Sequence, residues 1–276
     1  SFYQMKKKIL IIGKKGLIGF NLNSLLKVKN NTVNLDYKKF IKKKISFICR
    51  FDCLINCTSN KNYINDKYQK KNDFDLIIAN KIKKLDIKMI MLSTRKVYKN
   101  GSNLKESSSV SPKNNYSKNK LMTEIALAKI LKKKILILRI SNIIGFNKRK
   151  HNKLHKIFID IFYENIKKGL LFNNKDSYKD FISVNKFCEI VEKLIKTDAY
   201  GIFNISLGKK VFLKQITQWL NFHNNKKVEF TKIKKINKPD NFTLNNDKLM
   251  NKIRVKNSVK DLKKYCIQLS KEFFKV

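Results

Sequence analysis

A tyrosine and a lysine stand four residues apart in the segment 111–124, at Tyr116 and Lys120. If this segment is helical, the two side chains lie on one face about a turn apart. The Lys120 ammonium then favours the phenolate form of Tyr116, which makes an otherwise inert phenol a usable proton donor and acceptor. Pro112 fits the first turn of such a helix, because it stops any helix arriving from upstream. The pair is informative only together with other motifs, since this spacing also arises by chance in a lysine-rich helix.

A glycine-rich loop near the start of the chain is a second candidate site. Residues 8–12 form a run that is apolar from Ile9 onward and typical of a buried parallel strand, and three of the eight glycines follow it in G-x-x-G-x-x-G spacing. Glycine permits a tight turn, a close approach of backbone N–H groups to a pyrophosphate, and close packing of the next helix, whose N-terminus favours phosphate. The order strand, loop, helix predicts a dinucleotide site at Gly13, Gly16, Leu17, Ile18 and Gly19.

An acidic residue follows the second predicted strand, residues 32–35. This residue, Asp36, lies seventeen positions beyond Gly19. A carboxylate there accepts hydrogen bonds from an adenine ribose and repels a 2′-phosphate, which favours NAD. Lys38 and Lys39 follow at once and suit that phosphate, so NADP stays possible. A plain turn role for Asp36 also stays open.

Polar residues follow each of the next apolar runs. The run 51–57 ends in Asn56 and Cys57 and is followed by Thr58, the run 88–92 leads into Ser93 and Thr94, and the run 136–140 leads into Ser141 and Asn142. Ligands of open α/β sheets bind at the carboxyl ends of the strands. We therefore expect these side chains to lie along one ligand-binding edge.

The alternation of strands and helices predicts an α/β fold, a Rossmann-type doubly wound parallel sheet. We expect a dinucleotide-binding domain at 5–145, a smaller mixed α/β substrate-binding part at 146–276, and a return of 180–205 to the first domain. Residues 37–50 are too few for a complete helix-plus-strand unit, so one crossover is expected to be trimmed. Helical patterns cover 73–85, 151–168, 186–196, 211–222 and 259–274.

The net charge of +43 is extreme, but only five of the 63 basic residues are arginine. The lysines are spread from Lys6 to Lys275. Nucleic-acid sites favour arginine and cluster their charge, so a compositional bias on solvated surface explains most of this charge better than an evolved polyanion site. Nonspecific attraction to nucleic acid at low salt is still expected.

Cysteine and histidine usage predicts a cytoplasmic protein without a metal. The five cysteines contain no C-x-x-C and are expected to be reduced thiols. His151 and His155 are four apart, but no further ligand pattern supports a metal site. No apolar run approaches the roughly 18 residues of a membrane span, and no signal-peptide pattern is evident.

In this order the segments resemble the extended short-chain dehydrogenase/reductase family, the NAD-dependent epimerase/dehydratase type that acts on nucleotide sugars. The resemblance runs along most of the chain. Its motifs are the glycine loop at 13–19, an N-A-A-type strand end at 56–59, S-S/T-x-x-V-Y/F at 93–98, E…P-x-x-x-Y-x-x-x-K-x-x-x-E at 106–124, L-R-x-x-N-x-x-G at 138–145, R-D-F-I/V-H-V at 179–184 and G-x-F/Y-N-I/V-x-x-G at 201–208.

The resemblance implies a hydride transfer between a nicotinamide and a sugar carbon, C4 being expected. Tyr116 is then the acid/base, Lys120 also holds the nicotinamide ribose, and Thr94 hydrogen-bonds the reacting hydroxyl or carbonyl. Ser93 and Asn142 are expected at the substrate, Asn142 near its diphosphate. The cofactor residues implied are Gly13, Gly16, Leu17, Ile18, Gly19, Asp36, Asn56, Cys57, Thr58, Tyr116 and Lys120.

Departures from the family pattern narrow the reaction. The 4,6-dehydratases carry Asp-Glu directly after the threonine, where this chain has Arg95 and Lys96, so water elimination is disfavoured. Lys179 replaces the usual arginine. The small carboxyl part resembles in size the reductases of 4-keto-6-deoxy sugar nucleotides, and a 4-epimerase stays equally open.

Two other classes of function, and the assembly state, stay open. The fold could be retained by a catalytically lapsed protein that binds RNA through its basic surface, or by a cofactor-sensing regulator without turnover. An intact set of Thr94, Tyr116 and Lys120 argues against both. An amphipathic helix at 211–222 or 259–274 could cap the sugar site or contact a second copy, so a homodimer is possible.

Overall fold

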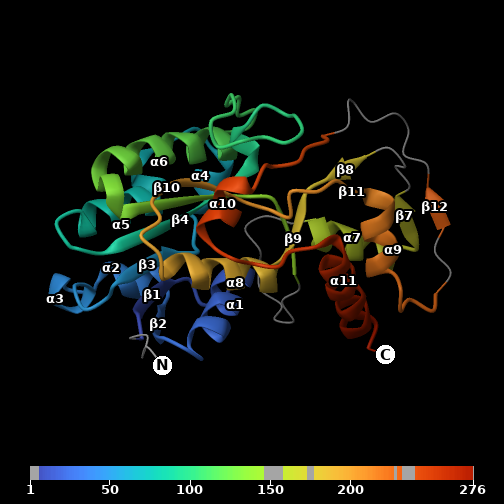
Figure 1. The fold of residues 1–276 in the computed structure, drawn as a ribbon, viewed down its shortest axis with the longest axis horizontal. Helices are drawn as coiled ribbons and strands as arrows, with labels where there is room; N and C mark the ends of the chain where they lie inside the picture. Colours follow the sequence, from blue (N-terminus) through green and yellow to red (C-terminus); the bar gives the residue numbers. More distant parts are fainter. Residues whose placement is uncertain (1–5, 146–157, 173–176, 227–228, 232–239, 276) are drawn as a thin grey trace.

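The computed structural model describes residues 6–145, 158–172, 177–226, 229–231 and 240–275 (Figure 1). Six strands form a central sheet in the order β2-β1-β3-β4-β5-β10, and every neighbouring pair is parallel. This confirms the predicted doubly wound sheet. The strands are β1 Lys8–Ile12, β2 Asn31–Leu35, β3 Cys53–Asn56, β4 Lys88–Thr94, β5 Ile135–Ile140 and β10 Gly201–Ile205.

The apolar strands are buried because helices cover both faces of the sheet. Alternate residues of β1 point to opposite sides, so that Ile9 and Ile11 belong to one core cluster and Leu10 and Ile12 to another. Helices α1 (Leu17–Leu26) and α8 (Val184–Ile195) pack on the first face. Figure 1 shows α5 (Phe74–Ile82) and α6 (Asn115–Leu131) on the opposite face, where they close the second cluster.

The crossover after β2 is short, as the sequence predicts. Only two brief helices, α2 (Tyr37–Ile41) and α3 (Ile45–Ile48), separate β2 from β3. As a result β2 forms one edge of the sheet. Strands β1 and β3 lie side by side, and the chain winds outward from them in opposite directions. Their carboxyl ends therefore meet at the switch point where ligands bind in such sheets.

Residues 178–183 form two short strands outside the central sheet, and residues 184–205 then return to it. Strand β8 (Tyr178–Lys179) leads into β9 (Phe181–Ser183), which pairs with β6 (Asn142–Ile144). Helix α8 then packs against α1, and β10 pairs with β5. The division into two domains stays a prediction.

The carboxyl-terminal elements gather at one end of the molecule (Figure 1). Their third core cluster joins α7 (Phe158–Lys167), α9 (Leu213–Leu220) and α11 (Val259–Phe274). The predicted helix 211–222 begins only at Leu213, because residues 211–212 form β11 and pair with β8. The remaining elements are α4 (Lys61–Asn65), α10 (Asp247–Lys252), β7 (Leu170–Phe172) and β12 (Glu229–Thr231), with short 3₁₀ turns at 70–72, 95–97 and 132–134.

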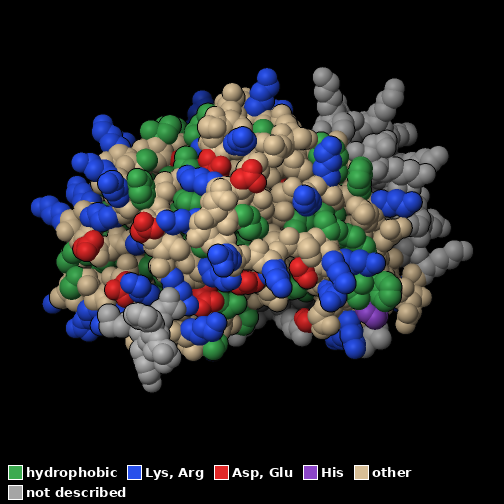
Figure 2. Space-filling model, in the orientation of Figure 1, with side chains coloured by type: hydrophobic (Ala, Val, Ile, Leu, Met, Phe, Trp, Pro, Cys, Tyr) green, Lys and Arg blue, Asp and Glu red, His purple; other side chains and the backbone are tan. Residues whose placement is uncertain are grey.

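Several sequence expectations concern metals, thiols and membranes. All five cysteines lie in the described part and are free thiols. His151 and His155 lie outside the described residues, and among the described ones no cluster of metal-ligand side chains occurs. No helix within the described ranges is both long and apolar enough to cross a bilayer. On the face shown in Figure 2, lysine and arginine side chains are scattered, with acidic side chains between them.

Candidate active site

Helix α6 places the tyrosine and lysine of the Y-x-x-x-K motif. The helix begins after Asn114, whose side chain accepts a hydrogen bond from the Ser117 backbone N–H at 2.9 Å, and the Ser117 hydroxyl accepts one from Asn114 N at 3.3 Å. This capping box fixes the helix start at Asn115, directly before Tyr116. Tyr116 is half-buried, whereas Lys120, one turn further, is 4% exposed. The tyrosine therefore lies near the surface and the lysine beneath it.

Lys120 belongs to a buried polar array that spans three elements. Its Nζ lies 3.3 Å from Oδ2 of Asp75, in the first turn of α5. Oδ1 of Asp75 accepts a hydrogen bond of 2.8 Å from the Asn56 side chain, at the end of β3. The Asn56 Oδ1 in turn accepts from the Thr58 backbone N–H and hydroxyl at 3.1 and 2.7 Å. The lysine is thus linked to the strand end beside the glycine loop.

The surroundings of Lys120 keep it charged. Burial acts to lower the pKa of Lys120, but the Asp75 carboxylate, with smaller contributions from Tyr63, Tyr116 and Asp73, raises it above its ordinary value. The Lys120 ammonium also lies 5.5 Å from the centre of the Tyr63 ring. A permanent positive charge is therefore fixed close to Tyr116.

The glycine loop packs against the carboxyl end of β3. Gly13 has φ +118°, and an added Cβ would lie 2.9 Å from the Thr58 methyl carbon. A Cβ at Gly19 would lie only 2.0 Å from the Gly13 carbonyl oxygen and 3.3 Å from Cβ of Cys57. Both positions thus require glycine. At Gly16 an added Cβ would meet nothing within 4 Å, so the loop is open there.

The two residues between Gly16 and Gly19 begin α1 and serve its packing. Leu17 and Ile18 lie against the core cluster on the α1 face. A Cβ added at Gly145 would lie 3.3 Å from the Leu17 side chain. Their backbone N–H groups belong to the first turn of α1, where orphan donors suit an anion.

Thr94 and Ser93 end β4, but their hydroxyls have different surroundings. Both residues extend the predicted strand, because they pair in register with Arg139 and Ile140 of β5. The Thr94 hydroxyl accepts the Lys96 backbone N–H at 3.2 Å. The Ser93 hydroxyl donates to the Glu124 carboxylate. Ser93 is therefore engaged inside the protein, and its substrate contact stays a prediction.

Other motif residues form the scaffold behind Thr94. Arg139 donates to Glu124 through Nε and through Nη2, the latter at 2.6 Å, and lies over the Tyr98 ring. The Tyr98 hydroxyl donates to Asn204 at 2.7 Å, and the Asn204 backbone N–H donates to Glu106 at 2.9 Å. These buried, satisfied groups hold β4, β5, β10 and α6 together.

Asn142 lies beside a cluster of charged side chains. Its backbone N–H donates to the Asp180 carbonyl at 3.2 Å, next to Lys179. Nζ of Lys179 lies 3.1 Å from Oδ2 of Asp240, which also pairs bidentately with Arg95. Arg95 is 6% exposed and its guanidinium stacks 3.8 Å from the centre of the Phe242 ring. Burial acts to raise the pKa of Asp240, but Arg95 and Lys179 outweigh it and hold that pKa below its usual range.

Asp36 lies at the end of β2 and precedes α2. Its side chain makes no capping bond to that helix. The Gly13 backbone N–H donates to the Leu35 carbonyl at 2.7 Å, so the end of β2 adjoins the start of the glycine loop. Asp36 is therefore next to the loop, as expected for a ribose contact, with Lys38 and Lys39 in the following turn.

Two acidic residues of this region have no signal in the sequence. Asp75 lies 45 positions from Lys120, and Asp240 lies 145 positions from Arg95. No local spacing joins residues so far apart. Within the predicted helix 73–85, Asp75 is one of several polar residues, so the sequence does not single it out.

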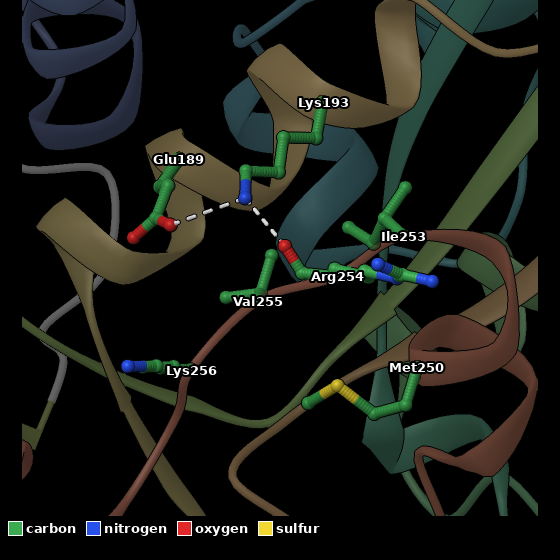
Figure 3. A pocket seen from close by; sticks show the side chains of 7 residues that line it. All are labelled: Glu189, Lys193, Met250, Ile253, Arg254, Val255 and Lys256. Atoms are coloured by element: carbon green, nitrogen blue, oxygen red, sulfur yellow. Dashed lines mark hydrogen bonds and ion pairs between the residues drawn. The ribbon is translucent and has the colours of Figure 1, made fainter.

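A surface groove of about 570 Å³ lies away from these residues, between α8 and the chain that follows α10 (Figure 3). Lys193 reaches across it and donates to the Arg254 carbonyl, with Glu189 alongside at 3.7 Å. None of the predicted site residues lines this groove. The candidate site therefore rests on the strand ends and α6.

Solved structures with the same fold include several nucleotide-sugar enzymes. A UDP-N-acetylglucosamine 4-epimerase from Methanobrevibacter ruminantium M1, in complex with UDP-N-acetylmuramic acid, has a TM-score of 0.81 at 18% identity, covering 98% of this chain and 99% of that one. A dTDP-glucose 4,6-dehydratase from Bacillus anthracis, in complex with NAD, has a TM-score of 0.74 at 14% identity and covers 98% and 97%. A dTDP-4-dehydrorhamnose reductase from the same species, in complex with NADP, has a TM-score of 0.73 at 18% identity and covers 98% and 99%.

At these identities the likeness shows the fold. No curated protein sequence matches this chain. The sequence model described as the NAD dependent epimerase/dehydratase family matches residues 9–206, which is most of the chain. That range includes the glycine loop, Thr94, Tyr116 and Lys120. The chain therefore belongs to the NAD-dependent epimerase/dehydratase family.

Proposed function

We propose that the protein is an NAD(P)-dependent enzyme that transfers a hydride at C4 of a nucleotide-activated sugar, as a 4-keto reductase or a 4-epimerase. One observation carries the proposal: a buried, charged Lys120 lies beneath a half-buried Tyr116 and is joined through Asp75 and Asn56 to the strand end that contacts the glycine loop. A hydride-transfer enzyme needs a proton relay next to its cofactor, and this arrangement supplies one.

The residues at the switch point fit a dinucleotide. Gly13 and Gly19 keep the loop flat against β3, and the open side at Gly16 leaves room for a pyrophosphate at the start of α1. Asp36 suits the adenine ribose, and Asn56, Cys57 and Thr58 line the neighbouring strand end. The loop residues Leu17 and Ile18 contribute backbone N–H groups.

The chain supplies binding, orientation and proton transfer. A bound nicotinamide supplies the hydride acceptor or donor. Lys120 holds the ribose hydroxyls and stabilises negative charge on Tyr116. Tyr116 moves the proton to or from the sugar oxygen, and Thr94 hydrogen-bonds the same oxygen.

The charged side chains near Asn142 suit the diphosphate of the substrate. Lys179 and Arg95 bring positive charge to the carboxyl ends of β4 and β5, and Asp240 is their carboxylate partner. A nucleoside diphosphate carries the opposite charge and is the chemistry that this cluster would bind.

Elimination of water is disfavoured for a physical reason. Arg95, which follows Thr94, is ion-paired to Asp240 and is no acid or base for the sugar. A reductase and an epimerase both need only the Thr94, Tyr116 and Lys120 set, so both remain within the proposal. We retain the cytoplasm as the proposed location, which the free thiols support, and a homodimer as a possible assembly.

A fluorescence titration with NADH and, separately, NADPH tests the cofactor. Moderate salt screens nonspecific attraction to so basic a surface. We expect saturable binding with NADH preferred, because Asp36 repels the 2′-phosphate. Asp36→Asn should weaken NADH binding about tenfold and reduce the preference for NADH over NADPH. Absence of binding to both cofactors would overturn the proposed function.

Cofactor fate distinguishes the two reactions. With UDP- and dTDP-linked sugars as substrates, a reductase consumes one reduced nicotinamide for each product formed. The absorbance of the reduced nicotinamide therefore falls. An epimerase returns the hydride, so the absorbance stays level while the sugar changes configuration. Loss of water from the sugar would contradict the role given to Arg95.

A further inference from the structure

Asp75 is a buried acid whose two oxygens both serve residues of the candidate site. It lies in the first turn of α5, and its side chain is 5% exposed. Oδ2 faces the Lys120 ammonium at 3.3 Å, and Oδ1 accepts the Asn56 amide at 2.8 Å. A buried carboxylate is expensive unless it is paired and hydrogen-bonded, and here both conditions are met.

The Asn56 side chain connects Asp75 to the residues that pack on the glycine loop. Its Oδ1 holds the Thr58 backbone N–H and hydroxyl, and the Thr58 methyl carbon lies 2.9 Å from the place of a Cβ on Gly13. A continuous path of short contacts thus runs from Lys120 through Asp75 and Asn56 to the glycine loop. The polar side chains along it are all hydrogen-bonded or ion-paired.

Helix α5 does not need Asp75 for its own stability. Its N-terminus is capped by Asp73, which accepts the Leu76 backbone N–H at 3.0 Å. Its apolar residues Ile78, Ala79 and Ile82 are fully buried in the core cluster of that face. Helix propensity alone does not select an aspartate at position 75, since leucine is the better helix former. The carboxylate is therefore explained by what it contacts.

We propose that Asp75 is a positioning residue, whose carboxylate fixes the Lys120 ammonium and the Asn56 amide in one array and so aligns the nicotinamide end of the cofactor site. The inference rests on the proposed function, because it assigns Asp75 a task only if Lys120 holds a cofactor. Asp75 touches neither substrate nor cofactor and acts through its two partners.

The charges around Lys120 define how the array responds to pH. Asp75 and Asp73 from α5, Tyr63 from α4 and Tyr116 from α6 all act to raise the pKa of Lys120, against its burial. Asp75 is the largest of the raising influences. Without that carboxylate, the largest influence opposing burial is gone, so the pKa of Lys120 falls and it loses its proton at a lower pH.

The test is the affinity for NADH, or for NADPH if that binds better, from pH 7 to pH 9. Wild-type affinity should change less than about threefold over this range. Asp75→Asn keeps the shape and removes the charge, and its affinity should fall about tenfold or more as the pH rises. Asp75→Glu keeps the charge, so its affinity should depend on pH as little as that of the wild type. Asp198 is an exposed acid on another surface, and Asp198→Asn should leave the pH dependence of the affinity unchanged.

A second substitution separates positioning from a merely structural role. In a Lys120→Met background the lysine no longer titrates, so Asp75→Asn should add no pH dependence. A wild-type pH profile in Asp75→Asn, or the same added slope in the Lys120→Met background, would overturn the inference while the proposed function stands. Failure of the wild type to bind either cofactor would overturn both.

Folding of the variants is checked by circular dichroism. If Asp75→Asn does not fold, the double variant Asp75→Asn with Lys120→Met tests whether the unpaired Lys120 ammonium is the cause. Restored folding supports the pairing, because no uncompensated buried cation is left. Continued failure overturns it, since Asp75 would then be required by the fold alone.

Discussion

The side chains given chemical roles are held with very different degrees of constraint. Lys120 is fixed by a buried ion pair, and Thr94 by the end of β4 and the turn that follows it. Tyr116 is half-buried and lies one helical turn before Lys120 in α6. A proton must pass between Tyr116 and a bound sugar, so its phenol has to be reachable from outside the core.

Replacement of Tyr116 by phenylalanine removes the phenol oxygen without a change of shape. We expect turnover to fall about 10²–10⁴-fold while NADH affinity stays nearly unchanged, because Lys120 and the glycine loop remain. Tyr200 is an exposed tyrosine directly before β10, and Tyr200→Phe is the matched control, which should change neither turnover nor NADH affinity. Near wild-type turnover in Tyr116→Phe would remove Tyr116 from the mechanism.

Roles that depend on neighbouring residues could be predicted from the sequence, and roles that depend on distant ones could not. Tyr116 and Lys120 are related by the helical repeat, which the sequence displays directly. Asp75 reaches Lys120 only because α5 and α6 pack side by side on one face of the sheet. Asp240 reaches Arg95 only because the chain before α10 returns over the end of β4, and nothing local signals that return.

At the scale of elements, the tightest approach of the site lies within the glycine loop, between Gly19 and the Gly13 carbonyl, and the residues that follow β3 pack against both glycines. The helix that follows the loop can approach only if position 19 lacks a side chain, since a Cβ there would lie 2.0 Å from a carbonyl oxygen. Position 16 faces open space. The same motif therefore contains two glycines required for packing, Gly13 and Gly19, and one, Gly16, that is open to a ligand.

Alanine substitutions separate these two uses of glycine. Gly19→Ala should lower the free energy of unfolding by at least ~2 kcal/mol, because backbone atoms must move. Gly16→Ala should change stability by no more than about 0.5 kcal/mol yet weaken cofactor binding. Urea unfolding and the NADH titration measure the two effects. Equal stability of the two variants would contradict the contact described here.

Asp180, between β8 and β9, links the chain after β10 to the chain before α10. Its carboxylate accepts the backbone N–H groups of Leu207, Gly208 and Leu244 at 3.0 to 3.1 Å. Asp180→Asn replaces an acceptor oxygen by a donor and leaves at least one of these groups unpaired. We expect a loss of about 2 kcal/mol in the free energy of unfolding, measured by urea denaturation.

The pH dependence of that loss has a definite sign. Burial raises the pKa of Asp180 to about 7, against the three N–H groups that lower it. A carboxyl with a raised pKa in the folded state contributes stability at low pH and loses it as the pH rises through about 7. The advantage of the wild type over Asp180→Asn should therefore shrink between pH 5 and pH 8. An advantage that grows with pH would contradict the raised pKa.

Element positions followed from the sequence where one physical signal dominated. Strands β1, β4 and β5 each contain an apolar stretch, at 9–12, 89–92 and 135–138, because helices cover both faces of the sheet, and helix 259–274 shows a clear amphipathic repeat. The start of α9 was predicted two residues early, because residues 211–212 are drawn into a strand by β8. Pairing of that kind is a tertiary effect without a local pattern.

At the scale of the whole molecule, the charge of +43 stands apart from the site. Basic side chains are scattered over the face in Figure 2 and are interspersed with acidic ones, so this face shows no single polyanion track. Neither the family match nor the fold matches include a nucleic-acid-binding protein among those described above.

Polynucleotide binding should accordingly be nonspecific and sensitive to salt. We expect RNA affinity, measured by fluorescence anisotropy, to fall at least tenfold between about 50 and 200 mM salt, because it arises from counterion release. NADH affinity should change far less over the same range, since it depends on buried contacts. Tight, sequence-selective RNA binding at the higher salt would favour the RNA-binding alternative.

The order in which the sheet is assembled has a consequence for synthesis of the chain. Helix α1 packs against α8, and β5 is covered at its outer edge by β10, although roughly 60 residues separate β5 from β10. At about 5–20 residues per second, a ribosome needs several seconds to supply them. During that interval the apolar face of α1 and the hydrogen-bonding edge of β5 have no partner from the chain. A nascent protein of this fold therefore depends on shielding, by the ribosome surface or a chaperone, until residue 205 has emerged.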